Sequence, residues 1–196
     1  GKIMKLKIKK LLGLALVTAM MMSVAACSSV SVDGEKDSGT ETKEGNGSIG
    51  LSVSTLNNPF FVTLTEGAKE KAKEKNVDLI VVDAGDDAAK QTSDIEDLIS
   101  KNISVLIVNP VDSDAVAPVV KDAIEKGIKV VSVDRIVNGV DVDSAIASDN
   151  VAGAKLAAEY LLSLVGEGSK VAELEGVPGA SATIDRGKGF HEIADT

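Results

Sequence analysis

The chain is poor in aromatic residues: its 196 residues include three Phe, one Tyr and no Trp. Two of the phenylalanines nevertheless stand side by side in STLNNPFF, residues 54–61, directly after two asparagines and a proline. Asn and Pro are typical of turns, so Phe60 and Phe61 belong to a segment with the chemistry of a turn rather than of a core. The rest of the sequence must explain why two rings stand at the end of a predicted strand.

Cysteine and histidine are almost absent, since Cys27 and His191 are the only residues of their types. A single Cys excludes a disulfide within the chain, so the folded part must be held together by burial alone. No His/Cys spacing of a metal site is present, and His191 has no evident nucleophile as a partner. No GxGxxG or Walker sequence follows any predicted strand, which argues against a phosphate-binding loop. We therefore expect neither an enzyme nor a bound metal or cofactor.

The first 27 residues have the pattern of an export signal. Five lysines lie within the first ten residues, and the uncharged run from 11 to 26 is shorter than the roughly 20 apolar residues of a spanning helix. The run ends in VAAC, which resembles the lipobox of bacterial lipoproteins. We predict a signal peptide over 1–27 and lipidation of Cys27. The alternative is a plain signal peptide, or a short anchor, with an incidental Cys.

Removing these five lysines leaves 16 basic and 30 acidic groups, a formal charge of −14. A surface of this sign repels phosphate backbones and disfavours nucleic acid as a partner. Residues 28–47 contain only Val30 and Val32 as apolar residues, which predicts a disordered polar tether.

From residue 48 on, apolar patterns typical of strands and helices alternate. Strands are predicted at 49–54, 77–82, 104–109, 128–134 and 144–148, and helices from Pro59, at 91–101 and at 113–127. Nearly continuous apolar runs are typical of strands that are buried on both faces. The alternation predicts an α/β fold, a doubly wound parallel sheet. In such sheets, ligands bind beyond the carboxyl ends of the strands.

Polar and aromatic residues follow the ends of these strands. They are Ser54, Asn57, Asn58, Phe60 and Phe61 after the first strand, Asp83, Asp86 and Asp87 after the second, Asn109, Asp112, Ser113 and Asp114 after the third, and Asp134 and Arg135 after the fourth. Each hydroxyl of a sugar both donates and accepts hydrogen bonds, so carboxylate and guanidinium groups suit it. The apolar C–H faces of a sugar can pack on an aromatic ring. The sequence therefore predicts a site for a neutral polyol, such as a sugar, at this edge.

Two interpretations are open for the most informative of these residues. Phe61 fits the inward stripe of its helix and is either a core residue or a rim residue, whereas Phe60 is harder to bury and is expected on the rim. Asp134 and Arg135 form either a simple surface ion pair or a ligand-binding couple.

Other residues at the strand ends are expected to have local structural roles. Ser113 and Asp114 are expected to cap the helix that follows them. Asp86 and Asp87 are expected to be turn or cap residues. Asn58 either contacts the ligand or shapes the turn before the proline.

Five motifs together resemble the periplasmic D-ribose-binding proteins, the sugar-binding components of ABC importers. They are STLNNPFF (54–61), VNPVDSDAV (108–116), VDR (133–135), IASDN (146–150) and RGKGF (186–190), and the resemblance covers about residues 48–195 in order. It implies two α/β lobes joined by a hinge, with the sugar in the cleft between them.

The resemblance also implies roles for individual residues. Ser54 and Asn58 would line the cleft, Phe60 and Phe61 would pack against the pyranose, Asp134 and Arg135 would bond its hydroxyls, and Arg186 would reach in from the second lobe. Asp149 and Asn150 are expected to cap the next helix.

The implied domains are a first lobe over 48–148 and a partial second lobe over 149–196. The second lobe is expected to contain a helix at about 150–164, a strand at 170–175 and the start of another helix. Because members of the family continue well beyond this point, we expect an incomplete second lobe with an exposed apolar segment, VAELEGV.

The expected function is that of an extracytoplasmic receptor, monomeric and anchored to the membrane by lipid. It would bind ribose or a similar sugar and deliver it to the permease of an ABC transporter. One alternative is a receptor that presents a sugar or signal to a sensor kinase without transport. Another is the sensor module of a LacI-type regulator, which an export signal in place of a DNA-binding segment opposes.

Overall fold

The structure is a computed structural model that describes residues 47–196, all of which belong to one compact unit of the chain. The predicted signal peptide, Cys27 and the predicted tether up to residue 46 lie outside the described residues. Within 47–196, no helix combines the length and the apolar character that a bilayer crossing requires.

Within the described residues, five parallel strands form one sheet in the order β2-β1-β3-β4-β5. The strands are β1 (Ile49–Val53), β2 (Leu79–Asp83), β3 (Val105–Val108), β4 (Lys129–Val133) and β5 (Ser144–Ile146). The chain adds β2 on one side of β1 and β3 on the other, so the strand order reverses between β1 and β3. The sheet confirms the predicted α/β class with parallel strands. The reversal marks the edge where ligands bind in such sheets.

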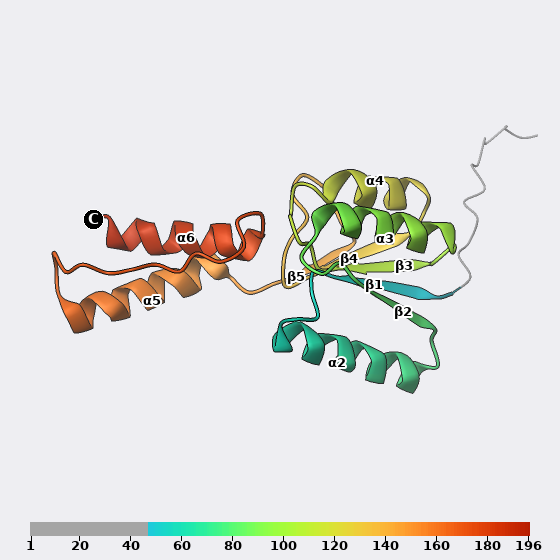
Figure 1. Cartoon of the computed structure of the whole chain (residues 1–196), viewed down its shortest axis with the longest axis horizontal. Coiled ribbons are helices and arrows are strands. Elements are labelled where there is room, and N and C mark those ends of the chain that lie inside the picture. Colours follow the sequence, from blue (N-terminus) through green and yellow to red (C-terminus); the bar gives the residue numbers. More distant parts are fainter. Residues whose placement is uncertain (1–46) are drawn as a thin grey trace, which may run out of the picture. The chain divides into compact units, whose positions relative to one another are not determined.

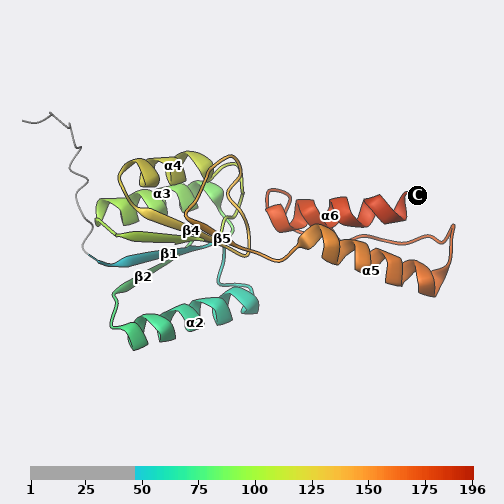
Figure 2. The same cartoon turned by 180° about the vertical axis from the view of Figure 1, so that it is seen from behind.

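Helices cover both faces of this sheet. Helix α2 (Pro59–Lys75) lies on one face, and α3 (Ala88–Ser100) and α4 (Ala117–Glu125) lie side by side on the other (Figure 1). Figure 2 shows the same arrangement from behind. The alternation of side chains along β1 fits these layers. Gly50 lies directly beneath the Leu98 side chain of α3, and Ser52 accepts a hydrogen bond from Gln91 of the same helix at 3.1 Å.

The main core between the sheet and helices α3 and α4 is aliphatic. Its buried members are Ile95, Leu98, Ile103, Leu106, Val108, Val116, Val119, Val120, Ala123, Ile128, Val130 and Val137. Full burial of one such branched side chain stabilises the fold by about 1.5–3 kcal/mol. The composition, with its few aromatic residues, matches this kind of core.

Side chains at the helix starts behave as N-caps. Asn58 accepts a hydrogen bond from the backbone N–H of Phe60 at 3.0 Å, and Pro59 occupies the first turn of α2. Asp87 caps α3 and Asp149 caps α5 (Asn150–Val165), each through backbone N–H groups of the first turn. The capping roles predicted for Asp87 and Asp149 are therefore confirmed.

The capping role predicted for Ser113 and Asp114 is wrong. No described side chain caps α4, and the carboxylate of Asp112 instead holds the turn that precedes the helix. Ser113 is fully buried and accepts a hydrogen bond from the backbone N–H of Ser181 at 3.1 Å. Asp114 accepts one from the Asn138 amide at 2.9 Å. These long-range partners take up the groups that a cap would have used.

After β5, the chain forms two helices, α5 and α6 (Ser181–Ala194), that pack closely against each other. Gly189 of α6 lies against the backbone carbonyl of Val151 in α5, so a methyl group has no room there. Helix α5 matches the helix predicted at about 150–164.

The strand predicted at 170–175 is wrong, because this segment has no regular secondary structure. An extended segment becomes a strand only when a neighbouring strand pairs with its backbone, and no described strand lies next to this one. Its apolar residues are exposed as expected, with Leu174 98% accessible and Val171 and Val177 partly accessible.

Candidate functional site

A cavity of about 300 Å³ lies at the carboxyl edge of the sheet. Its lining residues are Asn58, Phe60, Phe61, Asp134, Arg135, Ala182, Thr183 and Arg186. Asn58 and the two phenylalanines come from the start of α2, the Asp–Arg pair follows β4, and the last three residues belong to α6. The structure thus brings together six of the seven predicted ligand-binding residues, although they are far apart in the sequence.

The two phenylalanine rings have different environments. Phe60 is 56% exposed, whereas Phe61 is only 3% exposed. The rings meet edge to face, with their centroids 5.3 Å apart and an interplanar angle of 75°. Phe61 therefore has both roles that the sequence left open, since it is a buried residue of α2 whose ring also borders the cavity. Phe60 lies on the rim and presents its ring to solvent.

Arg135 is fixed by three different contacts. Its Nη1 donates to the carbonyl oxygen of Pro110 at 2.8 Å, and its guanidinium carbon lies 5.1 Å from the centre of the Phe61 ring. Its Nε lies 3.8 Å from Oδ2 of Asp134. The side chains of Arg135 and Asp134 are only 11% and 25% exposed. A simple surface ion pair would be far more accessible, so the couple belongs to the wall of the cavity.

Asp134 has a backbone conformation that explains how two consecutive residues line one cavity. In an extended strand, neighbouring side chains point to opposite faces. Asp134 follows the last residue of β4 with φ of 65°, in the left-handed region that Asp tolerates better than most residues. Its N–H donates to the carbonyl oxygen of Ile146 at 2.7 Å. This turn breaks the alternation, so Asp134 and Arg135 both reach the cavity.

Charges of both signs are gathered around the cavity. Burial lowers the pKa of the Arg135 guanidinium from its usual value, and the positive charge of Arg186 lowers it further. The carboxylates of Asp134 and Asp86 oppose this shift of the pKa. Arginine side chains are effectively always protonated at neutral pH. The cavity therefore offers two charged donor groups together with a carboxylate acceptor.

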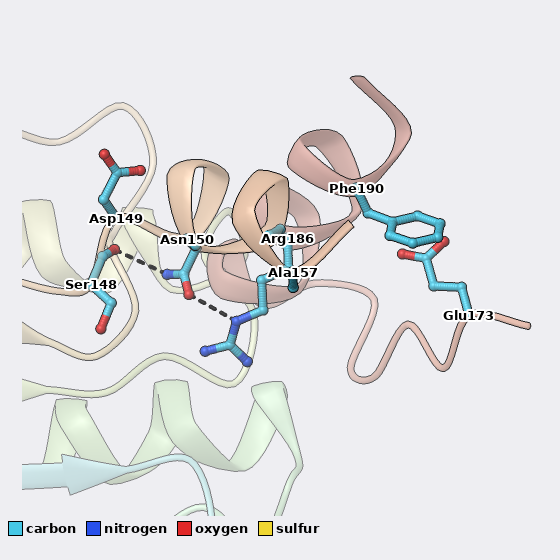
Figure 3. Close-up of a pocket in the computed structure, with 9 residues that line it drawn as sticks. Ser148, Asp149, Asn150, Ala157, Glu173, Arg186 and Phe190 are labelled. Carbon is cyan, nitrogen blue, oxygen red and sulfur yellow. Dashed lines mark hydrogen bonds between the residues drawn. The ribbon is translucent and has the colours of Figure 1, made fainter. Parts of the chain in front are cut away.

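Arg186 is held by the start of α5 (Figure 3). Its Nε donates to Oδ1 of Asn150 at 2.8 Å, and the Asn150 amide in turn donates to the carbonyl oxygen of Ser148 at 3.2 Å. Asn150 thus orients a cavity residue, a role that the sequence analysis did not assign. Arg186 also borders a second cavity of about 490 Å³, where Figure 3 shows Phe190 and Glu173 beyond Arg186.

Ser54, the seventh predicted residue, does not reach the cavity. It is fully buried, and its hydroxyl donates to Oδ1 of Asn109 at 2.7 Å. Its hydroxyl is engaged by this buried amide and does not line the cavity. The sequence placed Asn109 among the polar residues at the strand ends, but the sequence analysis assigned it neither a ligand contact nor a structural partner. The signal that could have found it is a single amide directly after the apolar run of β3 and directly before Pro110.

These features define a class of protein. A parallel sheet whose strand ends present aromatic and hydrogen-bonding groups, facing residues of a later helix, has the arrangement of the α/β proteins that place small-molecule sites at this edge. The sequence identifies the family more closely. Residues 49–196 match the periplasmic binding protein domain, and the chain belongs to that family.

Several characterised proteins are similar to this chain. The ribose import binding protein RbsB of Bacillus subtilis (strain 168) is 47% identical over 180 residues, which cover 92% of this chain and 59% of that protein. The Escherichia coli (strain K12) protein of the same name is 45% identical over 144 residues, covering 74% and 49%. The solved structure of a Caulobacter myo-inositol binding protein bound to myo-inositol has a TM-score of 0.70 at 33% identity, covering 74% and 50%. The chain thus spans about half the length of the relatives that it matches.

Proposed function

We propose that this chain provides the sugar-recognition edge of an extracytoplasmic receptor for an ABC importer. The sugar is ribose or a monosaccharide of similar size and hydroxyl pattern. The observation that carries the proposal is the convergence of Phe60, Asp134, Arg135 and Arg186 on one cavity. The names of the two ribose import relatives, at 47% and 45% identity, support ribose as the first sugar to test.

Each lining group has a recognition role in this proposal. The exposed ring of Phe60 packs against the apolar C–H face of the sugar. The Asp134 carboxylate accepts hydrogen bonds from hydroxyl groups, and the guanidinium groups of Arg135 and Arg186 donate to hydroxyl oxygens. Asn58 uses its Oδ1 as the helix cap, so its NH₂ group is the part that donates to the ligand. A volume of about 300 Å³ lies at the lower end of the range for small-molecule sites.

The proposal includes two lobes and a membrane anchor. A first lobe over 48–148 and a second lobe from 149 onward close on the sugar about a hinge, which removes water from the hydrogen bonds. Lipid on Cys27 and the polar tether over 28–47 keep the receptor near its permease and raise its effective concentration there. Attachment by two acyl chains is durable, whereas one chain gives only reversible binding. The receptor works as a monomer and binds no nucleic acid.

Calorimetric titration tests the sugar site. The chain, extended to the length of the relatives that it matches so that both lobes are present, is titrated with ribose, xylose, galactose and allose, and ribose is expected to bind most tightly. Arg135→Ala is expected to lower the affinity at least about tenfold, or about 1.4 kcal/mol. The matched control is Lys129→Ala, because this exposed cation pairs with Asp143 outside the cavity. Absence of binding for all four sugars, or equal losses in the two variants, would contradict the assignment.

A labelling experiment tests the anchor separately. Cells that express the chain are grown with radioactive palmitate, and the label is expected on the wild-type protein but not on a Cys27→Ser variant. Label on both proteins, or on neither, would rule out lipidation of Cys27.

A further inference from the structure

The registered residue pairs of the central strands end just before the edge that carries the cavity, and the backbone N–H of Asn109 still donates to the carbonyl oxygen of Ser52 at 2.8 Å. The last registered pair between β1 and β3 is Ser52 with Val108, and the last between β3 and β4 is Val108 with Ser132. Asn109 is the residue that directly follows β3. Since the strand order reverses between β1 and β3, Asn109 stands where a doubly wound sheet opens a crevice.

The Asn109 side chain fills this crevice with hydrogen bonds to both neighbouring strand ends. Its Oδ1 accepts from the backbone N–H of Ser54 at 3.1 Å and from the Ser54 hydroxyl at 2.7 Å. Its Nδ2 donates to the carbonyl oxygen of Val133 at 3.1 Å. Asn109 and Ser54 are both fully buried. One amide therefore links the ends of β1 and β4 across β3.

Both linked segments lead directly to residues that line the cavity. The chain from Ser54 continues into the turn that starts α2 and carries Phe60 and Phe61. Val133 immediately precedes Asp134 and its left-handed turn. A third hydrogen bond joins this point of the chain to the cavity. The carbonyl oxygen of Pro110, the residue after Asn109, accepts from the Arg135 guanidinium. The spacing between the aromatic and the charged halves of the cavity thus depends on this point of β3.

The position requires a neutral amide. An aspartate would keep the acceptor for Ser54, but its second oxygen would face the carbonyl oxygen of Val133 without a proton to share. An apolar side chain would leave the Ser54 hydroxyl and the Val133 carbonyl buried without these partners, which is costly. Gln91 holds the main chain at this position, because its side-chain amide donates to the backbone carbonyl oxygen of Asn109 at 2.9 Å.

We propose that Asn109 is a positioning residue of the cavity, with Ser54 as its buried partner. It touches no ligand itself. It fixes how far the rings at the start of α2 lie from the Asp134–Arg135 pair. The part of this inference that concerns sugar affinity rests on the proposed function, whereas the part that concerns geometry does not.

Fluorine NMR of the sugar-free protein tests the geometry. The chain contains only three Phe, so labelling with 4-fluorophenylalanine gives one signal each for Phe60, Phe61 and Phe190. In Asn109→Asp, the Phe60 and Phe61 signals are expected to shift, while that of Phe190 on α6 stays in place. Ser54→Ala, which removes only a hydroxyl, is expected to move the same two signals less. It serves as the gentler variant should the aspartate prevent folding.

The control is Val120→Ala, which trims an equally buried side chain in the core beneath α4. It lowers stability but is expected to leave the signals of Phe60 and Phe61 unchanged in the folded protein. The proposal is overturned if these signals do not move in the folded Asn109 and Ser54 variants. It is equally overturned if Val120→Ala moves them as much.

Sugar titration of the same variants, made in the chain extended to the length of its relatives, completes the test. Asn109→Asp is expected to lower affinity by at least about tenfold, and Val120→Ala by less than about twofold. If the extended wild-type chain, with both lobes present, binds no sugar, the proposed function fails, and the fluorine spectra still decide the role of Asn109. If it binds sugar and Asn109→Asp binds equally well, the positioning role is refuted.

Discussion

Phe60 and Phe61 are neighbours in the sequence, but the structure predicts unequal losses of stability when each ring is removed. Phe61 is 3% exposed, and replacing a buried Phe by Ala costs about 3–5 kcal/mol. Phe60 is 56% exposed, so less than half of its surface is removed from water. Since full burial of such a side chain is worth about 1.5–3 kcal/mol, Phe60→Ala is expected to cost about 1 kcal/mol.

Urea denaturation followed by far-ultraviolet circular dichroism measures this difference, because the chain has no Trp for fluorescence. With a slope of about 2 kcal/mol per molar urea, Phe61→Ala is expected to lower the midpoint by about 1.5–2.5 M. The corresponding shift for Phe60→Ala is about 0.5 M.

The affinity for sugar is expected to separate the two roles further. Phe60→Ala should weaken ribose binding about tenfold while the protein stays folded. Val62→Ala, at another exposed position of α2 outside the cavity, should leave binding unchanged. Equal losses of stability in the two Phe variants would show that the Phe60 ring is buried. Unchanged ribose affinity in Phe60→Ala would remove the ring from the site.

Two further predictions concern α6. Asp195, and then Glu173, raise the pKa of His191 above its ordinary value near 6.5. The stability that the His191–Asp195 contact contributes is therefore fully present below about pH 6.5, and it is lost as the pH rises through the raised pKa. NMR titration of this single imidazole is expected to show a lower pKa in Asp195→Asn, and an unchanged pKa would refute the contact. Gly189→Ala is expected to lower the free energy of unfolding by about 1–3 kcal/mol because it pushes α6 from α5. Gly153→Ala, with open space around it, is expected to raise it by about 0.5–1 kcal/mol, and similar urea midpoints for the two variants would contradict the close packing at Gly189.

The elements that the sequence predicted well are those set by local patterns. The apolar runs placed each of the five strands within a few residues of its observed position. Asp87 and Asp149 could be predicted as caps because a cap bonds to N–H groups within its own next turn. The edge with the candidate site followed from the same patterns, since parallel strands place their carboxyl ends together.

The predictions that failed depended on distant partners. Ser113 has the residue type of a cap, but it bonds to Ser181, which is 68 positions away. The segment 170–175 has the apolar content of a strand, but no described strand pairs with it. Ser54 has the polarity of a ligand contact, but its buried hydroxyl donates to the side chain of Asn109, which is 55 positions away.

The sequence by itself determined the sheet, its helices and the edge at which polar and aromatic residues gather. Periodicity and turn chemistry act over a few residues and can be recognised without any partner. Only the tertiary structure decided which of these residues face the cavity. Phe60 is exposed whereas Phe61 is buried. The left-handed turn at Asp134 places Asp134 and Arg135 at the same cavity. The Ser54 hydroxyl is bonded to the buried Asn109 amide and does not line the cavity. The physical reason is that the direction of a side chain at a strand end is fixed by hydrogen bonds to residues far away in the sequence.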